Sequence, residues 1–180
     1  GVSPKDAIRI NLGIDLGTSF TKVVWRLGEN SYPLCFGESP SNLDDYLVAS
    51  IVSFGKKDLM WGAETSNEEF LFSLVNFKMC LACESEKNDI CNIEKCSLTK
   101  WYPKAFSSEL KDQEAAFVNA FFLAKLLART KNLVVAELEK QGFRVPFTVE
   151  WIAKFSVPEK FIEQSPVATA FEKVFKTAWL

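Results

Sequence analysis

The sequence has 180 residues, of which 48% are apolar, and its formal net charge is −2. This length suits one compact domain, or one lobe of a larger protein, with a sizeable core. Basic residues are not in excess, so the charge of the chain does not indicate nucleic acid as a partner. No apolar run approaches the roughly 20 residues that span a bilayer. The first residues do not have the pattern of a secretory signal peptide, so we expect a cytoplasmic protein. Histidine is absent, which excludes catalysis by imidazole, including Ser-His-Asp schemes.

Strand patterns dominate the first third of the chain. Residues 8–16 alternate apolar and polar side chains and residues 20–27 form a second β-rich run, so the Gly17-Thr18-Ser19 link between them predicts a hairpin. The apolar runs that follow a loop predict further strands, at residues 31–36, 47–54 and 59–61. We expect a helix within residues 67–79 and an irregular, Cys-bearing insertion over residues 80–100.

The second half of the sequence alternates between helix and strand patterns. Apolar residues recur at three- and four-residue steps through residues 112–140, which predicts one long helix, and Gly142 follows as its stop signal. Residues 147–157 alternate again and predict a strand that ends at Pro158. Apolar positions at helical spacing between residues 171 and 178 predict a final helix.

The turn between the first two strands carries groups that suit a phosphate. Gly17 permits a tight turn and a close approach to the backbone, Thr18 and Ser19 add hydroxyls, and consecutive backbone N–H groups can form a site for an anion. Asp15 is itself an anion, so it fits this site only if Mg²⁺ or its water shell lies between the carboxylate and the phosphates. The alternative is an ordinary hairpin in which Asp15 and Thr18 form turn hydrogen bonds.

The stretch GIDLGTSFTKVVW resembles the first phosphate-binding hairpin of the actin-like ATPase superfamily, which includes actin, sugar kinases and DnaK-type heat-shock chaperones. Three later stretches resemble the chaperone branch in matching order: ASIVSFGKKDLMWGAET, VNFKMCLA and AKFSVPEKFIEQSPVATAFEKVF. The resemblance covers nearly the whole chain and is patchy between residues 80 and 110. It implies an α/β fold with a ribonuclease-H-like core, whose mixed sheet opens with an antiparallel meander. It also implies a division into the first part of the core, an inserted subdomain and a return to the core, at residues 1–44, 45–149 and 150–180.

The resemblance implies roles for matching residues in binding Mg-ATP or Mg-ADP. The phosphates would be lined by Gly17, Thr18, Ser19 and Phe20. Asp15 would face the water shell of Mg²⁺. Lys78 matches the catalytic lysine that contacts the γ-phosphate and the attacking water, where an ammonium stabilises developing charge; the alternative is a solvated surface lysine. Pro158 matches a proline implicated in signalling to a partner domain, although Pro166 stands where the family has an arginine, which puts that relay in doubt.

The expected function is therefore that of the N-terminal lobe of a DnaK-like chaperone ATPase, which contributes half of a Mg-ATP cleft. The family's second phosphate hairpin would follow Pro158, and no second Asp-x-Gly hairpin occurs there. These residues are thus expected not to hydrolyse ATP alone, and clients or cochaperones would bind through the full-length protein. The alternatives are a non-catalytic scaffold that binds partners through the Cys-bearing insertion, and another ATPase of the actin or sugar-kinase group.

Four of the five cysteines cluster within seventeen residues, at Cys80, Cys83, Cys91 and Cys96. Two thiolates at the spacing of the first pair can bind one zinc ion, and a second pair would complete a tetrahedron. The loop between the pairs is shorter than in a zinc ribbon. We expect a structural zinc that would stabilise the insertion; the alternatives are free thiols or an oxidisable pair.

Overall fold

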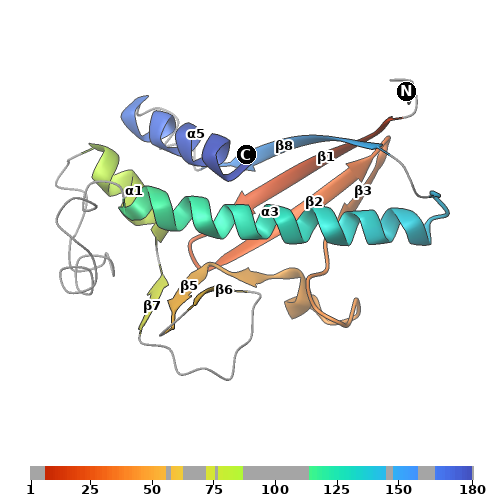
Figure 1. Cartoon of the computed structure of the whole chain (residues 1–180), viewed down its shortest axis with the longest axis horizontal. Helices are drawn as coiled ribbons and strands as arrows, with labels where there is room; N and C mark the ends of the chain where they lie inside the picture. Colours follow the sequence, from red (N-terminus) through yellow and green to blue (C-terminus); the bar gives the residue numbers. More distant parts are fainter. Residues whose placement is uncertain are drawn as a thin grey trace.

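The computed structural model describes residues 7–55, 58–62, 72–75, 77–86, 114–144, 148–157 and 165–179. In these residues the chain is a mixed α/β protein with two sheets and three α-helices (Figure 1). None of the described helices has the length and apolar character needed to cross a membrane.

The main sheet has the spatial strand order β3-β2-β1-β8. Its strands are β1 (Ala7–Leu16), β2 (Phe20–Leu27), β3 (Asn30–Pro33) and β8 (Thr148–Ser156). The first three strands form an antiparallel meander, and β8 pairs with β1 in parallel. A 3-10 helix, η2 (Leu43–Tyr46), precedes the short strand β4 (Val48–Ala49), which pairs with the start of β2. The predicted strands at residues 8–16, 20–27 and 147–157 are confirmed.

The alternation in the sequence gives the main sheet one buried and one exposed face. Successive side chains of a strand point to opposite faces. On β1 the buried positions are Ile10, Leu12, Ile14 and Leu16, and on β2 they are Thr21, Val23 and Trp25. The intervening side chains of both strands are mostly exposed, so the core lies on one side of this sheet.

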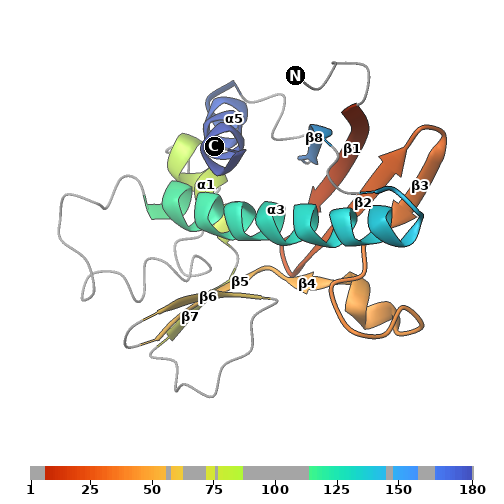
Figure 2. The same ribbon diagram turned by 45° about the vertical axis from the view of Figure 1, so that its right-hand side comes forward.

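Three helices complete the described fold: α1 (Phe77–Glu86), α3 (Glu114–Lys140) and α5 (Ser165–Trp179). Figures 1 and 2 show α3 running across the main sheet with α5 and α1 beside it. Buried residues of all three helices and of the main sheet belong to one hydrophobic cluster. The predicted helix at residues 112–140 is confirmed from residue 114 onward, and so is the final helix.

A second, smaller sheet lies on the other side of α3 from α5 (Figure 2). Its strand order is β6-β5-β7, with β5 (Ile51–Phe54), β6 (Leu59–Trp61) and β7 (Phe72–Val75). The ring of Trp61 meets that of Phe122 on α3 edge to face, with centroids 5.9 Å apart. This aromatic contact ties the small sheet to the long helix.

Several predicted elements of the sequence differ in the structure, and the strand predicted at residues 31–36 is the shorter β3, Asn30–Pro33. The run at residues 47–54 is not one strand, because it divides at Ser50 into β4, on the main sheet, and β5, on the small sheet. The sequence also predicts a helix within residues 67–79, but residues 72–75 form β7 and α1 begins at Phe77. A short apolar run fits either state, and pairing with β5 decides for strand. Helix α1 continues to Glu86, so residues 80–86 are helical rather than irregular; residues 87–100 lie outside the described part.

The C-terminal end of α3 confirms the stop signal at Gly142. Its φ of +97° lies in the region that favours glycine. The N–H of Gly142 donates to the carbonyl of Glu139 (3.0 Å), and that of Phe143 donates to the carbonyl of Leu138 (3.1 Å). These two bonds form a Schellman motif, which satisfies carbonyls that the helix leaves unpaired.

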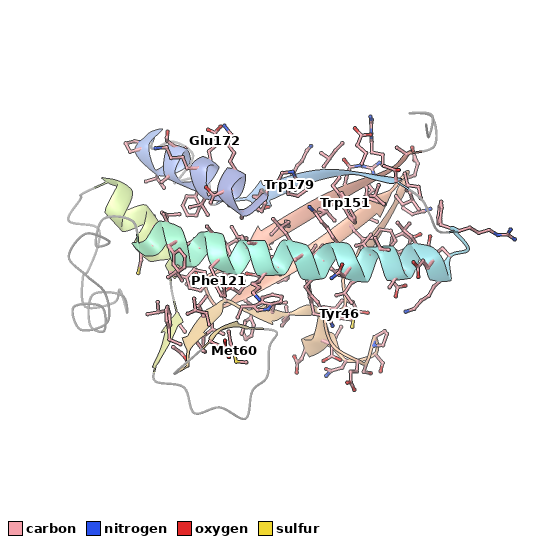
Figure 3. All side chains as sticks on the ribbon, in the orientation of Figure 1. Tyr46, Met60, Phe121, Trp151, Glu172 and Trp179 are labelled. Atoms are coloured by element: carbon pink, nitrogen blue, oxygen red, sulfur yellow. The ribbon has the colours of Figure 1, made fainter. Side chains whose placement is uncertain are left out.

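On α5, one exposed ion pair links successive turns. The ammonium of Lys176 lies 2.7 Å from the carboxylate of Glu172, which points outward in Figure 3. Hydrogen bonding and the positive charge of Lys176 lower the pKa of Glu172 below its ordinary value of 4.5. The ion pair therefore stabilises the folded protein slightly at pH values above the ordinary pKa of Glu172. This stabilisation is lost as the pH falls through the lowered pKa of Glu172 in the folded protein.

A lysine between two tryptophans joins α3, α5 and β8. The ammonium of Lys131 on α3 lies 4.1 Å from the ring centre of Trp179 and 6.0 Å from that of Trp151. Trp179 ends α5 and Trp151 lies on β8, and both rings appear on the same side of α3 in Figure 3. A cation over an aromatic face is stabilising, and here it also lies beside the negative end of the α5 dipole.

Replacement Lys131→Met tests this contact, because it keeps most of the aliphatic stem and removes the charge. We expect the free energy of unfolding to fall by about 1 kcal/mol, the size of a partly buried cation–π contact, in a urea titration followed by tryptophan emission. The matched control is Lys140→Met on the same helix, which loses only an exposed pair with Glu137 and is expected to change stability by less than about 0.5 kcal/mol. Equal effects of the two changes would contradict the role of Lys131.

Candidate functional site

The turn Gly17-Thr18-Ser19 lies where β1 ends and β2 begins. Because β8 runs parallel to β1, the carboxyl ends of these two strands meet at the same edge of the sheet, with Asp15 opposite Ser156. In α/β sheets, ligands bind outside the carboxyl ends of parallel strands. The predicted hairpin therefore occupies the edge of the sheet where a ligand site is expected.

Three carbonyls of this turn are held from the core side. The carbonyl of Leu16 accepts a hydrogen bond from the ammonium of Lys78 (2.5 Å). The carbonyl of Gly17 accepts one from the hydroxyl of Ser50 (2.8 Å), and that of Ser19 accepts one from the N–H of Ser50 (2.8 Å). Two residues distant in sequence thus fix the orientation of three peptide groups.

The outer side of the turn presents donors as a consequence. In a planar trans peptide the carbonyl and the N–H point in opposite directions. Since the carbonyls of Gly17 and Ser19 point toward Ser50, the N–H groups of Thr18 and Phe20 point away from it. The side chains of residues 18–20 are exposed, that of Phe20 by 49%. The exposed hydroxyls of Thr18 and Ser19 therefore lie in the same turn as these N–H groups, a set of donors that suits an anion.

Lys78 lies directly behind this turn. It occupies the first turn of α1 and is only 6% exposed, so it is not the solvated surface lysine of the alternative interpretation. The side-chain amide of Asn119 on α3 donates to the carbonyl of Phe77 (2.8 Å) and to that of Ala115 (2.7 Å), which fixes the start of α1 against α3. The ammonium of Lys78 adds positive potential at the hairpin, where weak screening by water strengthens its effect.

Asp15 lies on the exposed face of the main sheet. Its neighbours across the strands are Lys22 on β2 and Ser156 on β8. Among the residues that the structure describes, Asp15 forms no ion pair. The carboxylate is therefore exposed close to the turn, which is the placement that a contact to the water shell of a cation requires.

Two site residues were not singled out in the sequence, namely Thr21 and Ser50. Thr21 is fully buried and Ser50 is 3% exposed, and their hydroxyl oxygens lie 2.8 Å apart. The available signal was a small hydroxyl residue in each of two β-rich runs, where other polar residues also occur. That signal is weak, because small hydroxyl residues also occur in strands for packing reasons.

The cysteine prediction is only partly within the described chain. Cys80 is 1% exposed and disulfide-bonded, which matches the alternative of an oxidisable pair, since zinc requires thiolates. The side chains of Cys83, Cys91 and Cys96 lie outside the described residues, as does Pro158. No group of three or more potential metal ligands occurs among the side chains that are described, and a zinc site that includes Cys80 stays a prediction only for the reduced protein, in which this disulfide is broken.

Comparisons with known proteins leave the family of the chain open. No protein-family model matches the sequence, and no curated protein is significantly similar to it. The assignment of a function therefore depends on the chemistry of the turn and on the motifs in the sequence.

The close packing at Gly17 can be tested by substitution, with Gly13 on the adjoining strand β1 as the control. A Cβ at Gly17 would lie 2.0 Å from the carbonyl oxygen of Phe20, whereas one at Gly13 would meet only the carbonyl of Val24 at 3.8 Å. We expect Gly17→Ala to lower the free energy of unfolding by about 2 kcal/mol, as overpacking does, and to shift the amide resonances of residues 16–21. Gly13→Ala is expected to change stability by less than about 0.5 kcal/mol. Wild-type stability and wild-type resonances in Gly17→Ala would show that the turn is not this tight.

Proposed function

We propose that the chain is the N-terminal lobe of a DnaK-like ATPase and that its first hairpin binds the phosphates of Mg-ATP or Mg-ADP. The observation that carries the proposal is the held turn. Carbonyls of Leu16, Gly17 and Ser19 accept hydrogen bonds from Lys78 and Ser50, so the N–H groups of Thr18 and Phe20 lie on the opposite sides of their peptides from those bonds. Phosphate oxygens accept hydrogen bonds from such backbone donors and are attracted by a nearby cation.

The topology of the main sheet supports the fold part of the proposal. An antiparallel meander whose first strand pairs in parallel with a later strand fits a ribonuclease-H-like core. The proposed division assigns residues 1–44 and 150–180 to this core and residues 45–149 to an inserted subdomain. β8 then returns the chain to the edge of the sheet where the hairpin lies.

In the proposed site, charge is balanced between the two sides of the turn. Phosphates on the outer side would lie between the donors of the turn and a Mg²⁺ ion whose water shell contacts Asp15. The ammonium of Lys78 would stabilise negative charge from behind the turn, and it is the proposed catalytic group because developing charge on phosphoryl oxygens is the main demand of the reaction. No step of ATP hydrolysis is assigned to these residues alone, since the proposal gives them half of the cleft.

The proposed partners follow from the same assignment. Adenosine and a second set of phosphate contacts would come from sequence that these 180 residues do not contain. Client polypeptides and cochaperones would bind the full-length protein. A scaffold that keeps the fold and binds no nucleotide is the competing proposal, and it predicts no response of the hairpin to nucleotide.

Titration of the 180-residue protein with Mg-ADP and Mg-ATP, followed by amide resonances, tests the proposal directly. We expect the largest and saturable shifts at residues 17–20, because the outward N–H groups would contact phosphate. Gly17→Ala is expected to lose them and Gly13→Ala to keep them. Sodium chloride at matched ionic strength is the control for unspecific charge effects. Shifts that scatter over surface lysines with equal size would favour the scaffold, as would shifts that are absent both here and in a longer natural form that contains the second set of phosphate contacts.

Lys78→Met separates the charge of the lysine from its packing. Lys78→Met leaves the carbonyl of Leu16 without its donor, so we expect the free energy of unfolding to fall by about 1–3 kcal/mol. Affinity for Mg-ATP is expected to fall about tenfold, because the positive potential that the ammonium adds behind the turn is lost. In a longer natural form that turns over ATP, the same change is expected to abolish turnover. Unchanged affinity and turnover would remove Lys78 from the site.

A further inference from the structure

Ser50 occupies the point where the chain passes from the main sheet to the small sheet. It follows β4 and precedes β5, and it is 3% exposed. Its N–H donates to the carbonyl of Ser19, and its hydroxyl donates to the carbonyl of Gly17, both at 2.8 Å. One buried residue therefore contacts both ends of the hairpin turn.

The hydroxyl of Ser50 is also one link in a chain of hydrogen bonds. A serine hydroxyl has one proton, and Ser50 gives it to Gly17. The contact of 2.8 Å between the hydroxyls of Thr21 and Ser50 must therefore have Thr21 as donor. The order is Thr21 to Ser50 to Gly17, and each bond in such a chain polarises and strengthens the next.

The peptide between Gly17 and Thr18 has particular need of this bond. Glycine permits backbone conformations that other residues avoid, so the residue itself does not fix which way the peptide faces. If its carbonyl were released, the peptide could rotate and turn the N–H of Thr18 toward the core. A bound carbonyl excludes that rotation and keeps the N–H on the outer side.

From this geometry we infer that Ser50, with Thr21 as its donor, is a positioning residue for phosphate binding. It contacts no ligand and acts by holding the peptide of Gly17 in the binding orientation. The inference rests on the proposed function, because positioning is meaningful only if the turn binds phosphate. It adds two residues to those that determine the affinity for phosphate: Ser50, which is distant from the hairpin in sequence, and Thr21, which is buried on β2.

Ser50→Ala removes only the hydroxyl, because the backbone bond from Ser50 to Ser19 remains possible. The matched control is Ser53→Ala: Ser53 is 8% exposed, lies on β5 and exchanges a hydroxyl contact of 2.8 Å with Ser73, away from the turn. Both changes delete a buried hydroxyl; Ser50→Ala leaves the hydroxyl of Thr21 and the carbonyl of Gly17 without this partner, and Ser53→Ala leaves the hydroxyl of Ser73 without it. A purely structural effect should lower stability in both proteins and leave Mg-ADP affinity unchanged in both.

The experiment measures Mg-ADP affinity of the 180-residue protein and the amide resonances of Thr18 and Phe20 without ligand. We expect Ser50→Ala to lower affinity about three- to tenfold, the equivalent of one neutral hydrogen bond, and to shift both resonances before ligand is added. Ser53→Ala is expected to lose stability while affinity and both resonances stay as in the wild type. Thr21→Val, which keeps the shape, should lower affinity less than Ser50→Ala, and Thr21→Ser, which keeps the donor, should restore it.

The outcomes separate this inference from the proposal on which it rests. If the wild type responds to Mg-ADP at the hairpin and Ser50→Ala binds as Ser53→Ala does, the positioning role is wrong and the proposed function stands. If the wild type shows no response at the hairpin, both are overturned. Should Ser50→Ala fail to fold, the Thr21→Val and Thr21→Ser pair decides: equal affinities would overturn the inference, and a loss restored by serine would support it.

Discussion

The hydrogen bonds that reach the turn at residues 17–19 from the core side are the constraint on which the arrangement of the molecule depends. They join the main sheet to α1 through Lys78 and to the start of the small sheet through Ser50. Buried polar groups are tolerated only when they are paired, so each donor requires the turn to be where it is. The same bonds that satisfy buried groups also fix the peptides that carry the N–H groups of residues 18 and 20. The hydrogen bonds of Lys78 and Ser50 therefore both stabilise the contact of the turn with α1 and the small sheet and determine the shape of the candidate site.

Most of the main sheet could be predicted because its pattern is local. The alternation in β1, β2 and β8 requires only that one face be buried, and the spacing of apolar residues in α3 requires only a helix with one buried side. The division at Ser50 could not be predicted in this way, since the run at residues 47–54 is mostly apolar and its two serines do not mark a boundary. β4 and β5 are separated by tertiary contacts: the hydrogen bonds of Ser50 to the hairpin and the pairing of the two strands with different sheets. The helix predicted around β7 is wrong for a similar reason. Residues 72–75 are a strand because they pair with β5, about twenty positions earlier in the sequence.

The residues of the candidate site also differ in whether a local sequence pattern could predict them. Asp15 and residues 17–20 were identified from a motif that is contiguous in sequence, and Lys78 from a second stretch in matching order. That Lys78 is buried could not be derived from composition, because a lysine is ordinarily exposed. Thr21 and Ser50 carry no motif, and their chemistry exists only once two distant hydroxyls lie within hydrogen-bond distance. The sequence motifs thus predicted the contiguous turn and Lys78, but not the two hydroxyl residues that hold the turn.

The parallel pairing of β1 with β8 has a consequence for how the chain is made. Arg9 and its ion-pair partner Glu150 are 141 positions apart, and translation proceeds at about 5–20 residues per second. The hairpin of β1 and β2 can form early, but the second edge of β1 then stays without its neighbour for roughly 7–30 seconds of synthesis. An unpaired strand edge is a template for pairing with other chains. The risk of misassembly of the nascent protein is thus set by the length of sequence between these two strands and not by the stability of the finished sheet.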